Sequence, residues 1–90
     1  MKRYRLTNKW SIAYYNASDL DLRATELWGK ASFIGYFPTS EGKSIGLYSL
    51  DGFYVELYYD GFEGAIKDLK AISIDEALEK YIDKLYGEEK

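Results

Sequence analysis

The dipeptide Asp51-Gly52 lies between two runs of strand-forming residues, and it constrains the fold more than any other feature of the sequence. Asp-Gly is a preferred two-residue loop of a β-hairpin, because both residues tolerate the positive φ of a type I′ turn. In the second run, 53–60, the side chains on odd positions are apolar: Phe53, Val55, Leu57 and Tyr59. Alternate side chains of a strand face opposite sides of its sheet. The pattern therefore predicts an antiparallel hairpin of 44–50 and 53–60 with its odd-numbered face buried.

Residues 74–86 predict an amphipathic helix, because their apolar side chains recur at the spacing of one helical face. Such a helix must pack against another element, and the odd-numbered face of strand 53–60 offers a surface. We expect a core drawn from both elements and from the two tryptophans: Phe53, Val55, Leu57, Ile74, Leu78, Tyr81, Ile82, Leu85, Trp10 and Trp28. On this interpretation, truncating Leu78 or Ile82 to Ala costs about 2–5 kcal/mol.

Further strands are expected on both sides of the central hairpin. Residues 65–73 follow a glycine-containing loop and are predicted to form the next antiparallel strand. Residues 4–7 and 10–16 are interpreted as a second hairpin. The chain is therefore predicted to be one α+β domain, 1–90, with a mostly antiparallel, twisted sheet of five to six short strands and the C-terminal helix packed on one face.

The segment 20–37 allows several interpretations. One is a hairpin with a turn at 28–30 between two strands, 20–28 and 31–37. Another is a helix around 26–36, and a third is one helix through 8–28, although Asn16, Ser18 and Asp19 favour turns over helix interior. Glycines inside a helix cost about 1 kcal/mol each relative to Ala, and the run from Ser32 to Phe37 is rich in strand formers. The hairpin is the favoured interpretation.

Residues 4–16 resemble residues 48–60, which raises the hypothesis of an internally duplicated hairpin unit. An offset of 44 aligns four pairs of identical residues: Tyr4 with Tyr48, Leu6 with Leu50, Tyr14 with Tyr58, and Tyr15 with Tyr59. The same offset places Ile12 on Glu56, an apolar side chain on a charged one. Because a strand has a side-chain period of two, this mismatch argues against duplication. Two independent hairpins that follow the same turn rules are the favoured alternative.

The composition excludes several kinds of chemistry. The chain has no Cys and no His, so it forms no disulfide, and a structural zinc site is not expected. No cofactor or metal is predicted. No apolar run approaches the roughly 20 residues of a membrane span, and the N-terminus lacks the apolar core of a signal peptide, so a cytoplasmic protein is expected.

Charge is distributed unevenly along the chain. The first ten residues carry four basic and no acidic side chains, whereas the remainder carries eight basic and fifteen acidic ones. An exposed basic first strand explains this most simply, and contact with an anionic partner is the alternative. Since the chain lacks the overall basic footprint of nucleic-acid binders, a nucleic-acid partner is not expected.

No sequence motif indicates an enzyme. The sequence EGKS at 41–44 ends like a phosphate-binding loop, but Phe37 stands where that motif requires Gly. Glu56 is the best single candidate for acid–base chemistry, because it lies mid-strand between two tyrosines. If odd positions face the core, however, Glu56 faces water and keeps a near-normal pKa. We therefore predict a non-enzymatic protein.

The ten tyrosines are the sequence feature most indicative of function. Tyrosine is enriched at interfaces, because it combines apolar area with a hydroxyl group and few rotatable bonds. We expect a protein–protein interaction or self-association module that uses a Tyr-rich sheet face or an edge strand, with another protein or a second copy as partner. The predicted binding residues are Tyr54, Glu56, Tyr58, Tyr14 and Tyr48. The alternative is a small-ligand or carbohydrate binder, or a weak hydrolase, that uses Tyr54, Glu56 and Tyr58.

Overall fold

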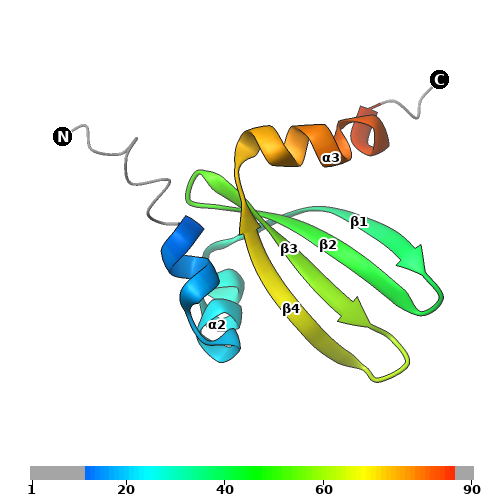
Figure 1. Ribbon diagram of the computed structural model, residues 1–90, viewed down its shortest axis with the longest axis horizontal. Helices are drawn as coiled ribbons and strands as arrows, with labels where there is room; N and C mark the ends of the chain where they lie inside the picture. Colours follow the sequence, from blue (N-terminus) through cyan, green and yellow to red (C-terminus); the bar gives the residue numbers. More distant parts are fainter. Residues whose placement is uncertain (1–11, 87–90) are drawn as a thin grey trace.

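The computed structural model describes residues 12–86 of the 90-residue chain and has an α+β fold (Figure 1). Residues 12–17 form a short helix. The other elements, in chain order, are α2 (Leu20–Lys30), β1 (Ser32–Ser40), β2 (Lys43–Leu50), β3 (Phe53–Asp60), β4 (Ala65–Ile72) and α3 (Ile74–Tyr86). The strands form one antiparallel sheet in the order β1-β2-β3-β4. None of the described helices is long and apolar enough to cross a membrane.

The predicted central hairpin is confirmed. Leu50 pairs with Phe53, and the two-residue loop between them, Asp51-Gly52, has φ values of 48° and 87°. A second two-residue loop, Glu41-Gly42, joins β1 to β2. The predicted strand after the glycine loop is also confirmed, as β4, which pairs antiparallel with β3. The sheet is therefore a meander of hairpins in sequence order.

On the odd-numbered face of β3, Phe53, Val55 and Leu57 are buried as predicted, whereas Tyr59 is 39 % exposed, and the helices that cover this face are not the one expected. Helix 12–17 and α2 pack there, around Tyr15 and Leu27. The buried cluster on this face consists of Tyr15, Leu27, Leu50, Phe53, Val55, Leu57, Leu69 and Ala71. In Figure 1, α2 lies at one side of the sheet and α3 crosses its top.

Helix α3 has the predicted bounds but lies on the even-numbered face of β3, which corrects the expected packing. Its buried side chains, Ala77 and Tyr81, join Leu47 and Ile72 in a second cluster. Tyr81 also lies against Phe37 of β1, with ring centroids 4.8 Å apart. The alternation of β3 distinguishes two faces, but it does not specify which helix covers which face.

Several predicted core residues are exposed. Ile74, Leu78 and Ile82 of α3 are about half exposed, as is Trp28 at the end of α2. Trp10 lies outside the described residues. The side chain of Leu85 is not described either. The reason for the exposure is rotational: α3 faces the sheet through the edge of its apolar stripe that carries Ala77 and Tyr81, and Ile74, Leu78 and Ile82 face outward.

The favoured interpretation of 20–37 is half right: its second strand, 31–37, is found as β1, but its first strand, 20–28, lies in helix α2. The alternative of a helix through 8–28 fits residues 12–28 better, although the helix is interrupted at Ser18 and Asp19. Gly29 falls in the last turn of α2, which ends one residue later at Lys30. The two glycines therefore do not lie inside one helix, and the penalty expected for them does not arise.

The predicted N-terminal hairpin is wrong in its described part. Residues 12–17 are helical, and strand 4–7 lies outside the described residues. In the hypothesis of duplication, residues 12–16 correspond to 56–60, which are a strand. The two stretches thus differ in structure wherever both are described. Within residues 12–86 the sheet has four strands, fewer than the five to six expected.

Two leucines, Leu27 of α2 and Leu78 of α3, provide a direct test of this packing. Leu27 is 1 % exposed and Leu78 is 46 % exposed. We expect Leu27→Ala to lower the free energy of unfolding by about 2–5 kcal/mol, because it leaves a cavity between α2 and the sheet. Leu78→Ala should lower it by about 1 kcal/mol, because nearly half of its surface already meets water. Urea titration of both variants measures the difference, and equal losses would contradict the observed rotation of α3.

Candidate functional site

Glu56 lies at the centre of the sheet, on the face that α3 covers. It stands in register with Leu47 of β2 and Lys70 of β4. Its side chain is fully buried. The expectation that Glu56 faces water is therefore wrong, because α3 covers the even-numbered positions that the sequence pattern assigned to solvent.

Both carboxylate oxygens of Glu56 accept hydrogen bonds. The Tyr58 hydroxyl donates to Oε1 at 2.8 Å. The Lys80 ammonium group donates to Oε2 at 2.5 Å and forms an ion pair with it. The Tyr81 hydroxyl also donates to Oε2. Two of these three donors come from α3, so the carboxylate links the helix to the central strand.

The environment of the carboxylate shifts the pKa values of three groups. Burial by itself raises the pKa of Glu56, but hydrogen bonds from Lys80, Tyr81 and Tyr58 outweigh this effect and hold the pKa below its usual value. Burial and the negative charge of Glu56 raise the pKa values of Tyr58 and Tyr81 above the usual value for tyrosine. At neutral pH Glu56 is therefore a carboxylate, and Tyr58 and Tyr81 are neutral phenols.

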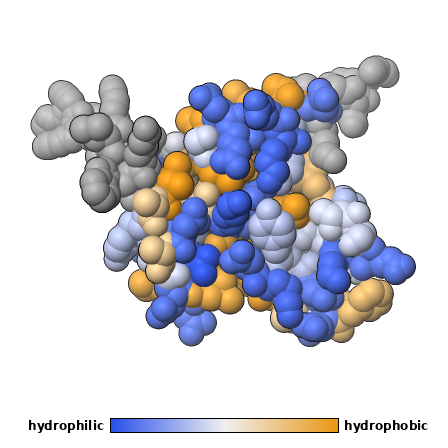
Figure 2. Space-filling view, viewed as in Figure 1, coloured by the Kyte–Doolittle hydropathy of each residue, from blue (hydrophilic) through white to orange (hydrophobic). Residues whose placement is uncertain are grey.

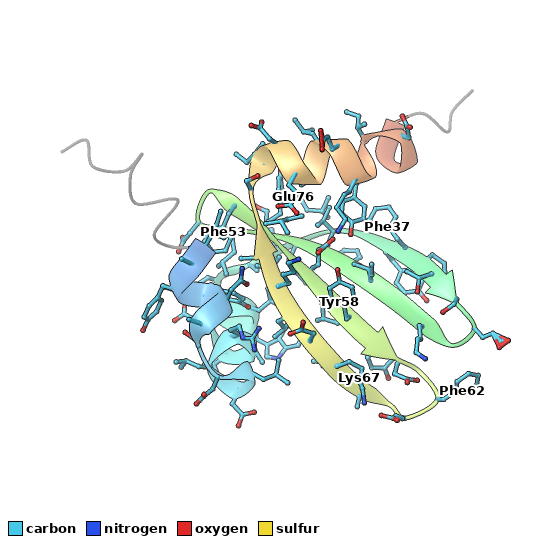
Figure 3. The ribbon with its side chains drawn as sticks, viewed as in Figure 1. Phe37, Phe53, Tyr58, Phe62, Lys67 and Glu76 are labelled. Carbon is cyan, nitrogen blue, oxygen red and sulfur yellow. The ribbon has the colours of Figure 1, made fainter. Side chains whose placement is uncertain are left out.

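In this arrangement the carboxylate of Glu56 is buried and bonded only to groups of the protein itself. A general base or a sugar-binding carboxylate needs an oxygen that reaches the ligand. The oxygens of Glu56 are buried and already bonded to protein donors. Figure 3 shows Tyr58 on the side of the sheet that α3 covers, with Phe37 below the helix. Tyr54 is partly buried there against the cluster around Tyr81.

The five residues predicted to bind a partner lie in three places. Tyr54, Glu56 and Tyr58 are together on the α3 face. Tyr48 lies on the opposite face, packed against the cluster under α2. Tyr14 is exposed on helix 12–17, at the rim of a cavity of about 220 Å³ that Arg23 and Phe53 also line. The sequence pattern placed these tyrosines side by side because it paired the central hairpin with an N-terminal one, whereas residues 12–16 of that second hairpin are helical.

An aromatic surface, defined here as Trp28, Phe33, Tyr36 and Tyr48, lies on the sheet face beside α2. Trp28 and Phe33 each contact Tyr48 edge to face, with ring centroids 6.1 and 5.4 Å apart. Phe33 is 60 % exposed and Tyr36 is 64 % exposed, and both belong to edge strand β1. Sequence reasoning missed this surface. The available signal was the position of Phe33 and Tyr36 in an uncharged strand.

Side chains from the helices cover the free edge of β4. The Asn16 side-chain amide accepts a hydrogen bond from the Ala71 N–H at 2.7 Å and donates to the Ala71 carbonyl at 3.0 Å. Arg23 donates to the Leu69 carbonyl. In the antiparallel ladder, the backbone N–H and C=O groups of Leu69 and Ala71 point away from β3. The contacts from Asn16 and Arg23 therefore occupy backbone groups that an added strand would have to bond.

The free edge of β1 has different chemistry. Its sequence, SFIGYFPTS, carries no charge, whereas β4 carries Lys67, Asp68 and Lys70. Among residues 12–86, no side chain hydrogen bonds to the backbone of β1. The alternation of the ladder directs the N–H and C=O of Tyr36 away from β2. Pro38 has the same orientation, so its missing N–H faces outward, where a sheet tolerates proline.

The described residues contain no evident metal centre. Within residues 12–86, no group of three or more Asp or Glu side chains is arranged to hold an ion. The cavity beside Tyr14 has mixed chemistry, with Arg23, Glu26 and Asp51 among its lining residues. Arg23 itself is directed to β4, where it pairs with Asp68 at 3.3 Å.

Glu56→Gln tests the structural role of the carboxylate. The substitution keeps the shape but removes the charge, and it places an amide N–H₂ against donors that need an acceptor. We expect the free energy of unfolding to fall by about 2–4 kcal/mol, because buried polar groups lose their partners. The matched control is Glu63→Gln, which removes an exposed ion pair with Lys67 and should have little effect. Similar losses in the two variants would contradict the proposed role.

The depressed pKa of Glu56 also predicts acid sensitivity. Stabilisation from this carboxylate is complete above its unfolded-state pKa of about 4.3 and is lost as pH falls through the lower pKa of the folded state. Urea titrations between about pH 6 and pH 2 should show the wild-type protein losing stability more steeply than Glu56→Gln, so that the two curves converge in acid. Parallel curves would show that Glu56 is not the responsible group.

No protein-family model, no curated protein and no solved structure matches this chain. Its function must therefore be inferred from its own residues and their geometry.

Proposed function

We propose that this protein is a non-enzymatic interaction module that binds an extended segment of a partner protein along the edge of β1. The contrast between the two edges of the sheet carries the proposal. Asn16 and Arg23 occupy the backbone groups of β4, whereas β1 is uncharged and offers the N–H and C=O of Tyr36. An open, apolar edge invites pairing with another strand.

Strand addition explains why the aromatic surface lies where it does. Backbone hydrogen bonds to β1 supply affinity that is independent of sequence, and alternate side chains of the added strand supply specificity. Side chains on one face of the added strand would lie beside Phe33 and Tyr36, with Trp28 and Tyr48 behind them. Aromatic side chains are the commonest anchors of protein interfaces.

The geometry of β1 limits the length of the added strand. Register shifts interrupt its pairing with β2 between Phe33 and Gly35 and between Pro38 and Ser40. Pro38 offers only an acceptor. The regular part of the edge is therefore short and centred on Tyr36, which suits one short peptide segment better than an open-ended stack of strands.

A second copy of the chain is the alternative partner. Because β1 has no charged side chain, antiparallel pairing of two β1 strands brings no like charges together. Light scattering over a concentration series distinguishes the two partners. If the protein forms a dimer and the substitution Tyr36→Pro dissociates it, the edge of β1 serves self-association.

Tyr36→Pro tests the edge directly. Proline at this position removes the outward N–H but no hydrogen bond to β2, so the sheet should persist. We expect peptides selected from a displayed random library on the wild-type protein to protect the Tyr36 amide from hydrogen exchange. Tyr36→Pro should weaken their binding at least about tenfold, the effect of one lost backbone pair and one aromatic anchor.

Tyr14→Ser is the matched control, because Tyr14 is an exposed tyrosine away from β1. It should bind the selected peptides as the wild-type protein does. A protein that is monomeric at all concentrations and selects no peptide would contradict the proposal, as would equal binding by Tyr36→Pro.

A further inference from the structure

Helix α3 carries an apolar ridge that the other described residues leave about half exposed. The α3 ridge consists of Ile74, Leu78 and Ile82, which recur every four residues and are 40–47 % exposed. Only Ala77 and Tyr81 of the described α3 side chains are buried against the sheet. Figure 2 shows apolar atoms at the top of the molecule, over α3, among strongly hydrophilic ones.

An acidic row runs beside this ridge. Asp75, Glu79 and Asp83 each follow a ridge residue by one position, so the row lies parallel to the ridge on the helix surface. All three are exposed, and none forms an ion pair with a described residue. Asp75 lies in the first turn, where the helix dipole favours a negative charge, but Glu79 and Asp83 lie four residues apart beyond it and repel one another, so these two do not serve the stability of α3.

We propose that the α3 ridge is the docking site for a basic amphipathic helix of a partner protein. Apolar side chains spaced by one turn are the anchors by which helices recognise one another. The acidic row requires Lys or Arg beside the apolar face of the partner, because like charges across an interface are costly. The ridge spans about 12 Å of helix, which corresponds to roughly two turns of the bound helix.

Charge argues against a second copy as the occupant. Two α3 helices related by a two-fold axis perpendicular to their length would pack antiparallel, ridge against ridge, whereas an axis along their length would set the sheet of each copy against the acidic row of the other. The acidic row lies on one side of the ridge and the sheet on the other, so the antiparallel arrangement places the two acidic rows together. Six carboxylates would then adjoin with no described basic side chain between them, and a basic partner avoids this repulsion.

The site is independent of the β1 edge. The ridge lies on α3, on the even-numbered face of β3, whereas the aromatic surface lies on the odd-numbered face. A variant that damages one surface should leave the other intact. The protein would then connect an extended segment and a helix, two different kinds of partner element.

Fluorescence anisotropy with two synthetic helical peptides tests the inference. Both peptides share one leucine face, and their polar positions are lysine in one and glutamate in the other. We expect the lysine peptide to bind at least about tenfold more tightly than the glutamate peptide, and its binding to weaken as salt is raised. Leu78→Ser should reduce binding of the lysine peptide about tenfold, the loss expected for one apolar anchor.

Matched variants separate specific docking from general attraction. Glu79→Lys should weaken binding of the lysine peptide severalfold, whereas Glu41→Lys, the same charge change in the β1–β2 turn, should have little effect. Tyr36→Pro should bind this peptide as the wild-type protein does. Circular dichroism of each variant confirms that the fold persists.

Several outcomes would overturn the inference. Equal binding of the two peptides, no binding of either, or equal losses in Glu79→Lys and Glu41→Lys would each show that the acidic row does not select the partner. A dimer of the protein alone that Leu78→Ser dissociates would assign the ridge to a second copy instead.

Discussion

The buried carboxylate of Glu56 is the constraint on which the position of α3 depends. A charge removed from water is costly unless hydrogen bonds and an opposite charge replace its hydration. Tyr58 donates from the same strand, but Tyr81 and Lys80 both donate from α3. The carboxylate is therefore fully bonded only when the helix lies on the sheet in one rotation. The apolar contacts of α3 are few, so these polar bonds define its position more narrowly than packing does.

The two faces of the sheet carry separate apolar clusters, and this explains the unequal edges. Helix 12–17 and α2 cover the odd-numbered face and lie close enough to β4 for Asn16 and Arg23 to bond its backbone. Helix α3 reaches β1 through the contact between Tyr81 and Phe37, on the other face. Among the described residues, no side chain of these three helices hydrogen bonds to the backbone of β1. The open edge thus follows from where the helices pack.

The elements that depend on local sequence signals could be predicted. The features that depend on residues far apart in the sequence, such as the burial of Glu56, could not. Asp51-Gly52 and the alternation of 53–60 were sufficient for the central hairpin, and the apolar period was sufficient for the bounds of α3. The burial of Glu56 could not be predicted, because its donors Lys80 and Tyr81 lie 24 and 25 residues away. An isolated glutamate between two tyrosines has the pattern of an exposed strand face. Helix α2 was missed because the glycines disfavour a helix around 26–36, and because Asn16, Ser18 and Asp19 disfavour one through 8–28. In the structure the helix breaks at Ser18 and Asp19 and begins again at Leu20.

The exposed ridge of α3 is a geometric consequence of the bonds to Glu56. Successive residues of a helix are rotated by about 100°, so the direction toward Glu56 lies between Lys80 and Tyr81. Relative to that direction, Leu78 is rotated by about 110° and Ile82 by about 150°, which places both away from the sheet. An apolar side chain at position 56 would need no hydrogen bond from Lys80 or Tyr81. The helix could then rotate about its own axis and bury Leu78 and Ile82. The buried charge therefore opposes the packing that the apolar stripe alone would favour, and it leaves the α3 ridge available to another molecule.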